Sequence, residues 1–225
     1  MAYPNTTGEI IKEALVLLGA DTTVAYYTDS IMNNWVNKAH KWAAGFHQWP
    51  FTQGKVTTTY ASLVTNEEGD LEGEYPEGWK NDSIRYMTIG GHKVQKTLFS
   101  KYRQFREERS SADDRIFTDF GRLYLVNPNI DVSGSIVMWG HYTPKDFDAT
   151  NPDEETVFSP TDTGNEALVE KVVSYGLHRQ KKFSEARAHH NQAVEILEQL
   201  WKQWRDEQYN YHDNAVSEGM FKRID

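Results

Sequence analysis

The chain contains no cysteine, which excludes disulfide bonds, thiol nucleophiles and thiolate metal sites. This composition fits a protein that is made in a reducing cytoplasm. The sequence also has no stretch approaching the roughly 20 apolar residues that span a membrane. Its first residues lack the basic-then-apolar pattern of a signal peptide. We therefore expect a protein that is assembled in the cytoplasm and has no membrane partner.

Sequence motifs of common catalytic sites are missing as well. There is no GxxxxGK[ST] phosphate loop, no GxGxxG turn, no GxSxG nucleophile elbow and no HExxH metal motif. His189 and His190 are adjacent, so on a helix they point about 100° apart and do not face one metal ion. We interpret His190 as a packed histidine on an apolar stripe, with a metal ligand or a pH switch as the alternatives. The sequence thus predicts a protein that is not an enzyme and needs neither cofactor nor metal.

Basic residues are in the minority: 24 Lys and Arg stand against 33 Asp and Glu, which gives a net charge of −9. This balance argues against a protein that binds nucleic acid by neutralising phosphates. It allows a protein that surrounds DNA without binding it tightly. Aromatic residues are abundant, with seven Trp, twelve Tyr and ten Phe, and such side chains fill cores and anchor protein interfaces. The 225 residues suffice for one sizeable domain, or for a compact body with a smaller inserted one.

Residues 1–50 carry the periodicity of two helices. The first is expected from Glu9 to Leu18, with Thr7 as its N-cap and Gly19 just past its C-terminus. The second follows Thr28 and presents one apolar stripe, which consists of Ile31, Trp35, Ala39, Trp42, Phe46 and Trp49. Pro50 is expected to end this helix.

Residues 51–164 change to short β-strands separated by turns. Residues 83–97 and 115–126 are each predicted to form a hairpin, because a glycine turn separates two apolar runs. Two acidic loops interrupt this region, and their carboxylates include Glu67, Glu68, Asp70, Asp153, Glu154 and Glu155. We interpret the loops as solvated, and two alternatives remain: carboxylates that face a channel or a partner, and a catalytic carboxylate pair.

Helical periodicity returns over residues 165–209, with a bend expected near Phe183 and an N-cap at Ser184. Residues 210–225 are polar and are expected to form an extended C-terminal tail, either frayed or ordered on a partner. The predicted fold is therefore α+β: a helical bundle from the N- and C-terminal helices, with an inserted, mostly antiparallel β-region between them.

Large apolar side chains on the helices and the tail are candidates for contacts between subunits. Trp35, Trp42 and Trp49 repeat every seven residues on one helix face, which fits an intramolecular core or, in part, an intersubunit contact. The tail offers small apolar anchors for a docking partner. The interface candidates are Trp35, Trp42, Trp201, Trp204, Met220, Phe221 and Ile224.

Three segments together resemble the head–tail adaptor proteins of tailed bacteriophages, also called connector or head-completion proteins. A helix that ends in Trp49-Pro50-Phe51 is similar to the helix-to-strand junction of that family. The hairpin from Phe120 to Pro128 is similar to its central element of glycine, apolar strand and proline. The segment from Tyr175 to Leu200 is similar to its C-terminal helical pair. The resemblance covers most of the chain, and the order and spacing of the segments carry it.

This resemblance implies a structural virion protein at the head–tail interface, assembled in the host cytoplasm. Such proteins form a ring, commonly a dodecamer, between the portal protein and a tail or stopper protein. Genomic DNA passes through the ring without sequence-specific binding during ejection, and no cofactor is needed. Three other functions remain open: a tail-tube, tail-completion or baseplate component; a cell-wall hydrolase that uses a glutamate of an acidic loop; and a DNA-binding regulatory module.

Overall fold

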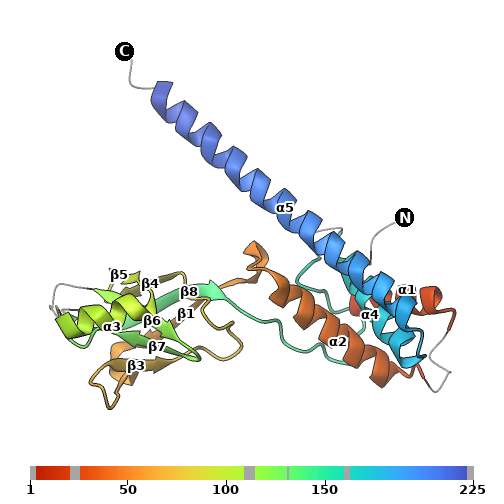
Figure 1. Ribbon diagram of the computed structural model, residues 1–225, viewed down its shortest axis with the longest axis horizontal. Coiled ribbons are helices and arrows are strands. Elements are labelled where there is room, and N and C mark those ends of the chain that lie inside the picture. The colour runs from red at the N-terminus through yellow and green to blue at the C-terminus, as the bar shows by residue number, and fades with distance from the viewer. Residues whose placement is uncertain (1–3, 21–25, 109–114, 131, 160–162, 222–225) are drawn as a thin grey trace. The chain divides into compact units, whose positions relative to one another are not determined.

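The computed structural model describes residues 4–20, 26–108, 115–130, 132–159 and 163–221, with side chains described up to Arg205 (Figure 1). The chain folds into two compact units. Unit 1 comprises the described residues up to His47 together with those from Asp146 onward. Unit 2 comprises the described residues between Gln48 and Lys145.

Unit 1 consists of the helices α1 (Thr7–Leu18), α2 (Asp29–Phe46), α4 (Gly164–Arg179) and α5 (Phe183–Phe221). Helix α4 packs against the other three and is buried along most of its length. Helix α1 begins with a capping box, in which Glu9 N donates to Thr6 Oγ1 (3.3 Å) and Thr6 N donates to Glu9 Oε2 (3.2 Å). The sequence had indicated Thr7 as the N-cap of this helix. The N-cap is instead Thr6.

Helix α2 ends at Phe46, earlier than predicted, because the chain is already extended at His47 (φ −136°, ψ 172°). Trp49 is extended as well, as expected for a residue that precedes a proline. Its side chain therefore leaves the apolar stripe of α2, is fully buried and stacks on Phe51 with ring centroids 5.5 Å apart. The seven-residue repeat of tryptophans consequently ends at Trp42.

Helix α5 follows a tight reversal at residues 180–182, where Lys181 has a left-handed backbone (φ 63°). Its 39 residues make it about 58 Å long. Its buried apolar side chains among those described are Ala186, Ala193, Leu197 and Leu200. Residues 210–221, predicted as part of an extended tail, continue the helix to Phe221. Figure 1 shows this end of α5 extending past α1, α2 and α4.

Unit 2 is dominated by one sheet of eight strands in the order β1-β8-β4-β5-β6-β7-β3-β2, curled into a half-barrel. The strands are β1 (Gln53–Thr59), β2 (Val64–Thr65), β3 (Leu71–Glu74), β4 (Tyr86–Ile89), β5 (His92–Lys96), β6 (Ile116–Phe120), β7 (Leu123–Val126) and β8 (Ser135–His141). The two predicted hairpins, β4–β5 and β6–β7, are confirmed. Their turns place Gly90, Gly91 and Gly121 at positive φ, which explains the glycines there. Short 3₁₀ turns precede and follow β1, at Pro50–Thr52 and Tyr60–Ser62.

Strands β5 and β6 form a parallel pair, and the crossover between them contains α3 (Phe99–Glu108), which packs on β6. Tyr102 of this helix is buried, whereas Leu98 is 68% exposed because it precedes the first turn of the helix. The core of unit 2 lies on the concave side of the sheet and includes Met87, Ile89, Val94, Phe117, Tyr124, Val126, Ile136 and Met138.

The predicted fold, a helical bundle that carries a smaller, mostly antiparallel β-insert, is wrong. The described chain is an α+β protein with five α-helices, and the mixed eight-stranded sheet is its dominant element. The prediction underestimated the sheet because β3 lies within the segment interpreted as an acidic loop. It missed the mixed character because the parallel β5–β6 pair joins segments on either side of a helix.

Candidate functional sites

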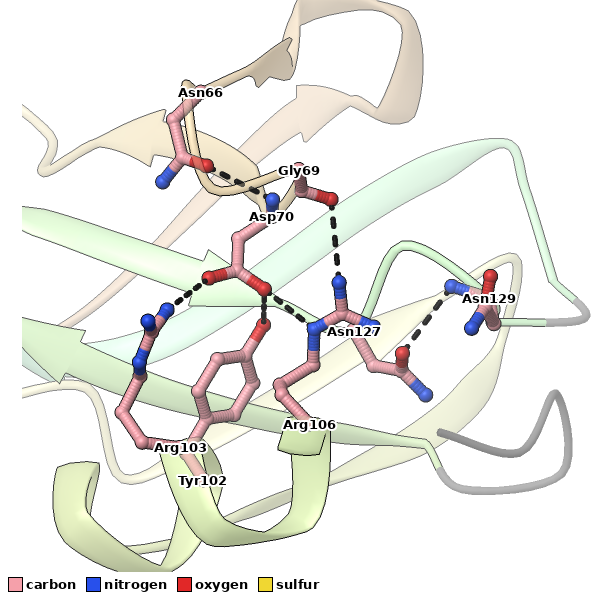
Figure 2. Close-up of polar contacts among 8 residues, drawn as sticks. All are labelled: Asn66, Gly69, Asp70, Tyr102, Arg103, Arg106, Asn127 and Asn129. Carbon is pink, nitrogen blue, oxygen red and sulfur yellow. Dashed lines mark hydrogen bonds and ion pairs between the residues drawn. The ribbon is translucent and has the colours of Figure 1, made fainter. Parts of the chain in front are cut away.

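The first acidic loop closes into a tight turn between β2 and β3. Asn66 N donates to Asp70 O (2.9 Å), Gly69 N donates to Asn66 O (3.0 Å), and Asp70 N donates to the Asn66 side-chain oxygen (2.8 Å). Gly69 has a positive φ of 80°, a backbone conformation that favours glycine. These bonds fix the direction of the Asp70 side chain, which points away from solvent (Figure 2).

The Asp70 carboxylate anchors this turn to helix α3. Arg106 Nε donates to Asp70 Oδ1 (2.6 Å), Arg103 donates to Oδ2 (3.1 Å), and the Tyr102 hydroxyl donates to Oδ1 (3.1 Å). Figure 2 shows the three donors converging on the carboxylate from one face of α3. Asp70 is fully buried, and burial together with its charge raises the pKa of Tyr102. Asp70 was interpreted as part of a solvated loop, with a channel- or partner-facing carboxylate as an alternative, whereas it is a buried anion that is paired with two arginines.

The other predicted carboxylates lie at the surface of two different units. Glu67 and Glu68 are exposed at the turn of unit 2. In unit 1, Asp153 and Glu155 are exposed, and the partly exposed Glu154 accepts a hydrogen bond from Asp148 N (2.9 Å). The structure does not bring the two loops together within one unit, so each is an acidic surface of its own unit.

The predicted interface tryptophans differ in exposure. Trp35 is 9% exposed and packs edge-on against Tyr27 at 6.2 Å, so it belongs to the core of unit 1. Trp42 is partly exposed and contacts the rings of Phe46 and His190. Trp201 stacks on His47 (4.6 Å), and Trp204 is partly exposed.

The remaining interface candidates lie at the end of the chain. Met220 and Phe221 fall in the last residues of α5, where side chains are outside the description. Ile224 lies outside the described residues altogether.

The histidines of α5 lie against α4. His189 Nδ1 is 2.5 Å from Glu170 Oε2, whereas His190 Nδ1 accepts a hydrogen bond from Lys171 Nζ (2.9 Å). Burial and the Lys171 charge lower the pKa of His190, which favours the neutral ring. Among the residues that the structure describes, no three His, Asp or Glu side chains lie close enough to hold a metal ion. The adjacent histidines thus tie α5 to α4 through separate partners.

A second buried acid, Asp119 on β6, was not anticipated from the sequence. Its carboxylate contacts Lys96, which also donates to Asp82 Oδ1 (2.9 Å). Burial raises the pKa of Asp119, while hydrogen bonds from Asp119 and Lys96 lower the pKa of Asp82. The Lys96 ammonium is thus shared by the two carboxylates, which makes these three side chains an ion-pair cluster. The contacts of Lys96 therefore hold Asp82 against the sheet. Asp82 has a left-handed backbone (φ 56°).

A cleft of unit 2 has a volume of about 610 Å³ and is lined by Thr57, Thr58, Glu72, Glu74 and Tyr124, among others. Glu72 and Glu74 project from the same face of β3. A general acid needs a carboxyl group that is shielded from water, and Glu74 is exposed. The cleft is therefore a surface groove that carries two acidic side chains, of which Glu72 is partly buried and Glu74 exposed.

Comparison of the sequence with protein-family models and with curated proteins returns no match. None of the described helices combines the length and hydrophobicity that a membrane crossing requires.

Proposed function

We propose that this chain is a structural virion protein of a tailed bacteriophage, a ring-forming adaptor between the portal protein and a tail or stopper protein. The three segments that resemble adaptor proteins lie at junctions and turns of the fold. Trp49-Pro50-Phe51 lies between α2 and β1, Phe120–Pro128 contains the β6–β7 turn and β7, and the chain reverses between α4 and α5. These features support the proposal through the resemblance.

The observation that carries the proposal is the length of α5. Helix α4 is its main partner within unit 1, and its last buried side chain among those described is Leu200. The helix nevertheless continues to Phe221 through the polar sequence that follows. Isolated helical segments shorter than about 12–15 residues are marginal in water. A helix that continues past its own unit gains stability from a partner, and the ring neighbours and the portal protein are the partners that an adaptor offers.

The test uses the full chain and a variant that ends at Asn210, mixed with the portal ring of the same phage and imaged by electron microscopy. The full chain is expected to form a ring that is coaxial with the portal and gives the copy number directly. The shortened chain should keep its thermal unfolding temperature and lose docking.

Docking of the shortened chain with unchanged affinity would refute the role of the helix end. The adaptor role would be refuted if the full chain did not bind the portal and instead co-purified with phage tails. That result would favour a tail-completion or baseplate component.

A further inference from the structure

The convex face of the sheet in unit 2 carries a row of cations and aromatic rings. The core residues Ile136, Met138 and Met87 point to the concave side, so their neighbours point outward. The register places Lys55 of β1 opposite Trp139 of β8, and Trp139 opposite Tyr86 of β4. Because adjacent strands lie about 4.8 Å apart, these three side chains form a row about 10 Å wide. Lys93 of β5 pairs with Thr88 and so lies diagonally beside Tyr86.

The side chains of this row contact one another. The Trp139 and Tyr86 rings meet edge to face with centroids 5.0 Å apart. Lys55 Nζ lies 5.5 Å from the Trp139 ring centroid, and Lys93 Nζ lies 5.8 Å from that of Tyr86. Tyr86, Lys55 and Lys93 are all exposed, so two cations flank an aromatic pair on an open surface.

A pocket of about 330 Å³ opens beside Trp139 and is lined by Gln53, Lys55, Arg85 and His141, among others. The nearby positive charges of Arg85 and Lys80 add to burial in lowering the pKa of His141. None of the outward positions of β1, β8, β4 and β5, all of which the structure describes, holds an acidic residue. The local charge of this face is therefore positive.

The charge balance differs between the two units. Unit 2 contains twelve Lys and Arg against thirteen Asp and Glu, so the excess of acid lies in unit 1. Within unit 2, Asp70 and Asp119 are already paired with basic side chains in the interior. The face of β1, β8 and β4 can thus attract an anion despite the net charge of the chain.

We infer that this face binds single-stranded nucleic acid, with the cations on phosphates and the bases against Trp139 and Tyr86. Cationic grooves with exposed aromatic rings bind single strands, because every base has a π-face that stacks on a ring. An acidic peptide would engage the cations and leave the rings unused, so the aromatic pair favours a nucleic acid strand. The inference does not depend on the proposed adaptor role.

The test measures fluorescence anisotropy of a labelled oligothymidine with the full chain at several salt concentrations. Binding is expected, with an affinity that falls as salt rises and a log–log slope near −2 if Lys55, Arg85 and Lys93 contact three phosphates. The double variant Lys55→Gln/Lys93→Gln should reduce the slope by about 1.4. The variant Tyr86→Ser should weaken binding roughly tenfold while leaving the slope unchanged.

A matched double variant, Lys12→Gln/Lys101→Gln, removes two exposed lysines elsewhere and should bind like the unmodified chain. Thermal unfolding of every variant establishes that the fold is retained. The inference is overturned if the oligonucleotide does not bind, or if the matched control loses as much affinity as the lysine variant. It is also overturned if polyglutamate displaces the oligonucleotide at equal charge concentration and Tyr86→Ser binds normally, which would identify an acidic protein segment as the ligand.

Discussion

Unit 1 is expected to lose stability as the pH falls, because His40 of α2 is buried in its neutral form. The ring stacks on Phe147 with centroids 4.5 Å apart, and its Nε2 accepts a hydrogen bond from Val157 N (3.1 Å). Protonation would remove that acceptor and leave a cation in the interior. Burial lowers the pKa of His40 to about 4, with Asp146 opposing the shift and Lys41 adding to it.

The sign and size of the effect follow from the two pKa values. In the unfolded chain His40 titrates near its ordinary value of 6.5, so between that pH and about 4 the unfolded state binds more protons than the folded state. The stability that the neutral ring contributes is complete above pH 6.5 and is lost as the pH falls through this window. A shift of this size corresponds to about 3 kcal/mol.

The assay is urea unfolding followed by circular dichroism at several pH values between 7.5 and 4, for the unmodified chain and for His40→Gln. The glutamine retains a side-chain acceptor but does not titrate, so the stability difference between the two proteins should shrink by about 3 kcal/mol on acidification. His178→Gln removes an exposed histidine of the same unit and should leave the pH dependence unchanged. If His40→Gln showed the same loss as the unmodified chain, the buried neutral histidine would not be the cause.

Three further predictions concern stability and are measured by the same urea unfolding at pH 7. Asp70→Asn should cost about 3 kcal/mol, because it leaves two arginines without their buried partner. Gly73→Ala should cost about 1–3 kcal/mol, since the new Cβ would lie 2.2 Å from the buried Tyr124 ring, whereas Gly45→Ala meets nothing within 4 Å and should be neutral or stabilising. Thr6→Ala should cost about 1 kcal/mol through loss of the capping box. Equal effects of the two glycine variants, or no effect of the other two, would contradict these assignments.

Elements whose signals are local were predictable from the sequence. The hairpins are marked by glycines that adopt positive φ, and the helices by apolar periodicity and caps. Strand β3, with the sequence Leu-Glu-Gly-Glu, shows no apolar alternation, because its pairing with β7 supplies the stability that its side chains do not. Only that distant partner identifies it as a strand, so the extent of the sheet was not predictable.

The site residues likewise divide into those with a local sequence signal and those that only a distant partner identifies. Asp70 and the exposed Glu67 lie in one acidic run, and composition alone does not separate them. A usable signal was the spacing of Arg103 and Arg106. It places two cations on one face of α3 and therefore predicts an anionic partner that packs against this face. The row of Lys55, Trp139 and Tyr86 gives no such signal, because its members are far apart in sequence and only the register of β1, β8 and β4 aligns them.

The net charge of −9 argues against a nucleic-acid ligand, but this average does not describe the local charge of the face of β1, β8, β4 and β5. At physiological ionic strength the field of an exposed charge decays over about 8 Å. A strand lying on this face would therefore respond chiefly to the charges within that distance, which include Lys55, Arg85 and Lys93. The salt dependence of binding should consequently reflect the cations of this face.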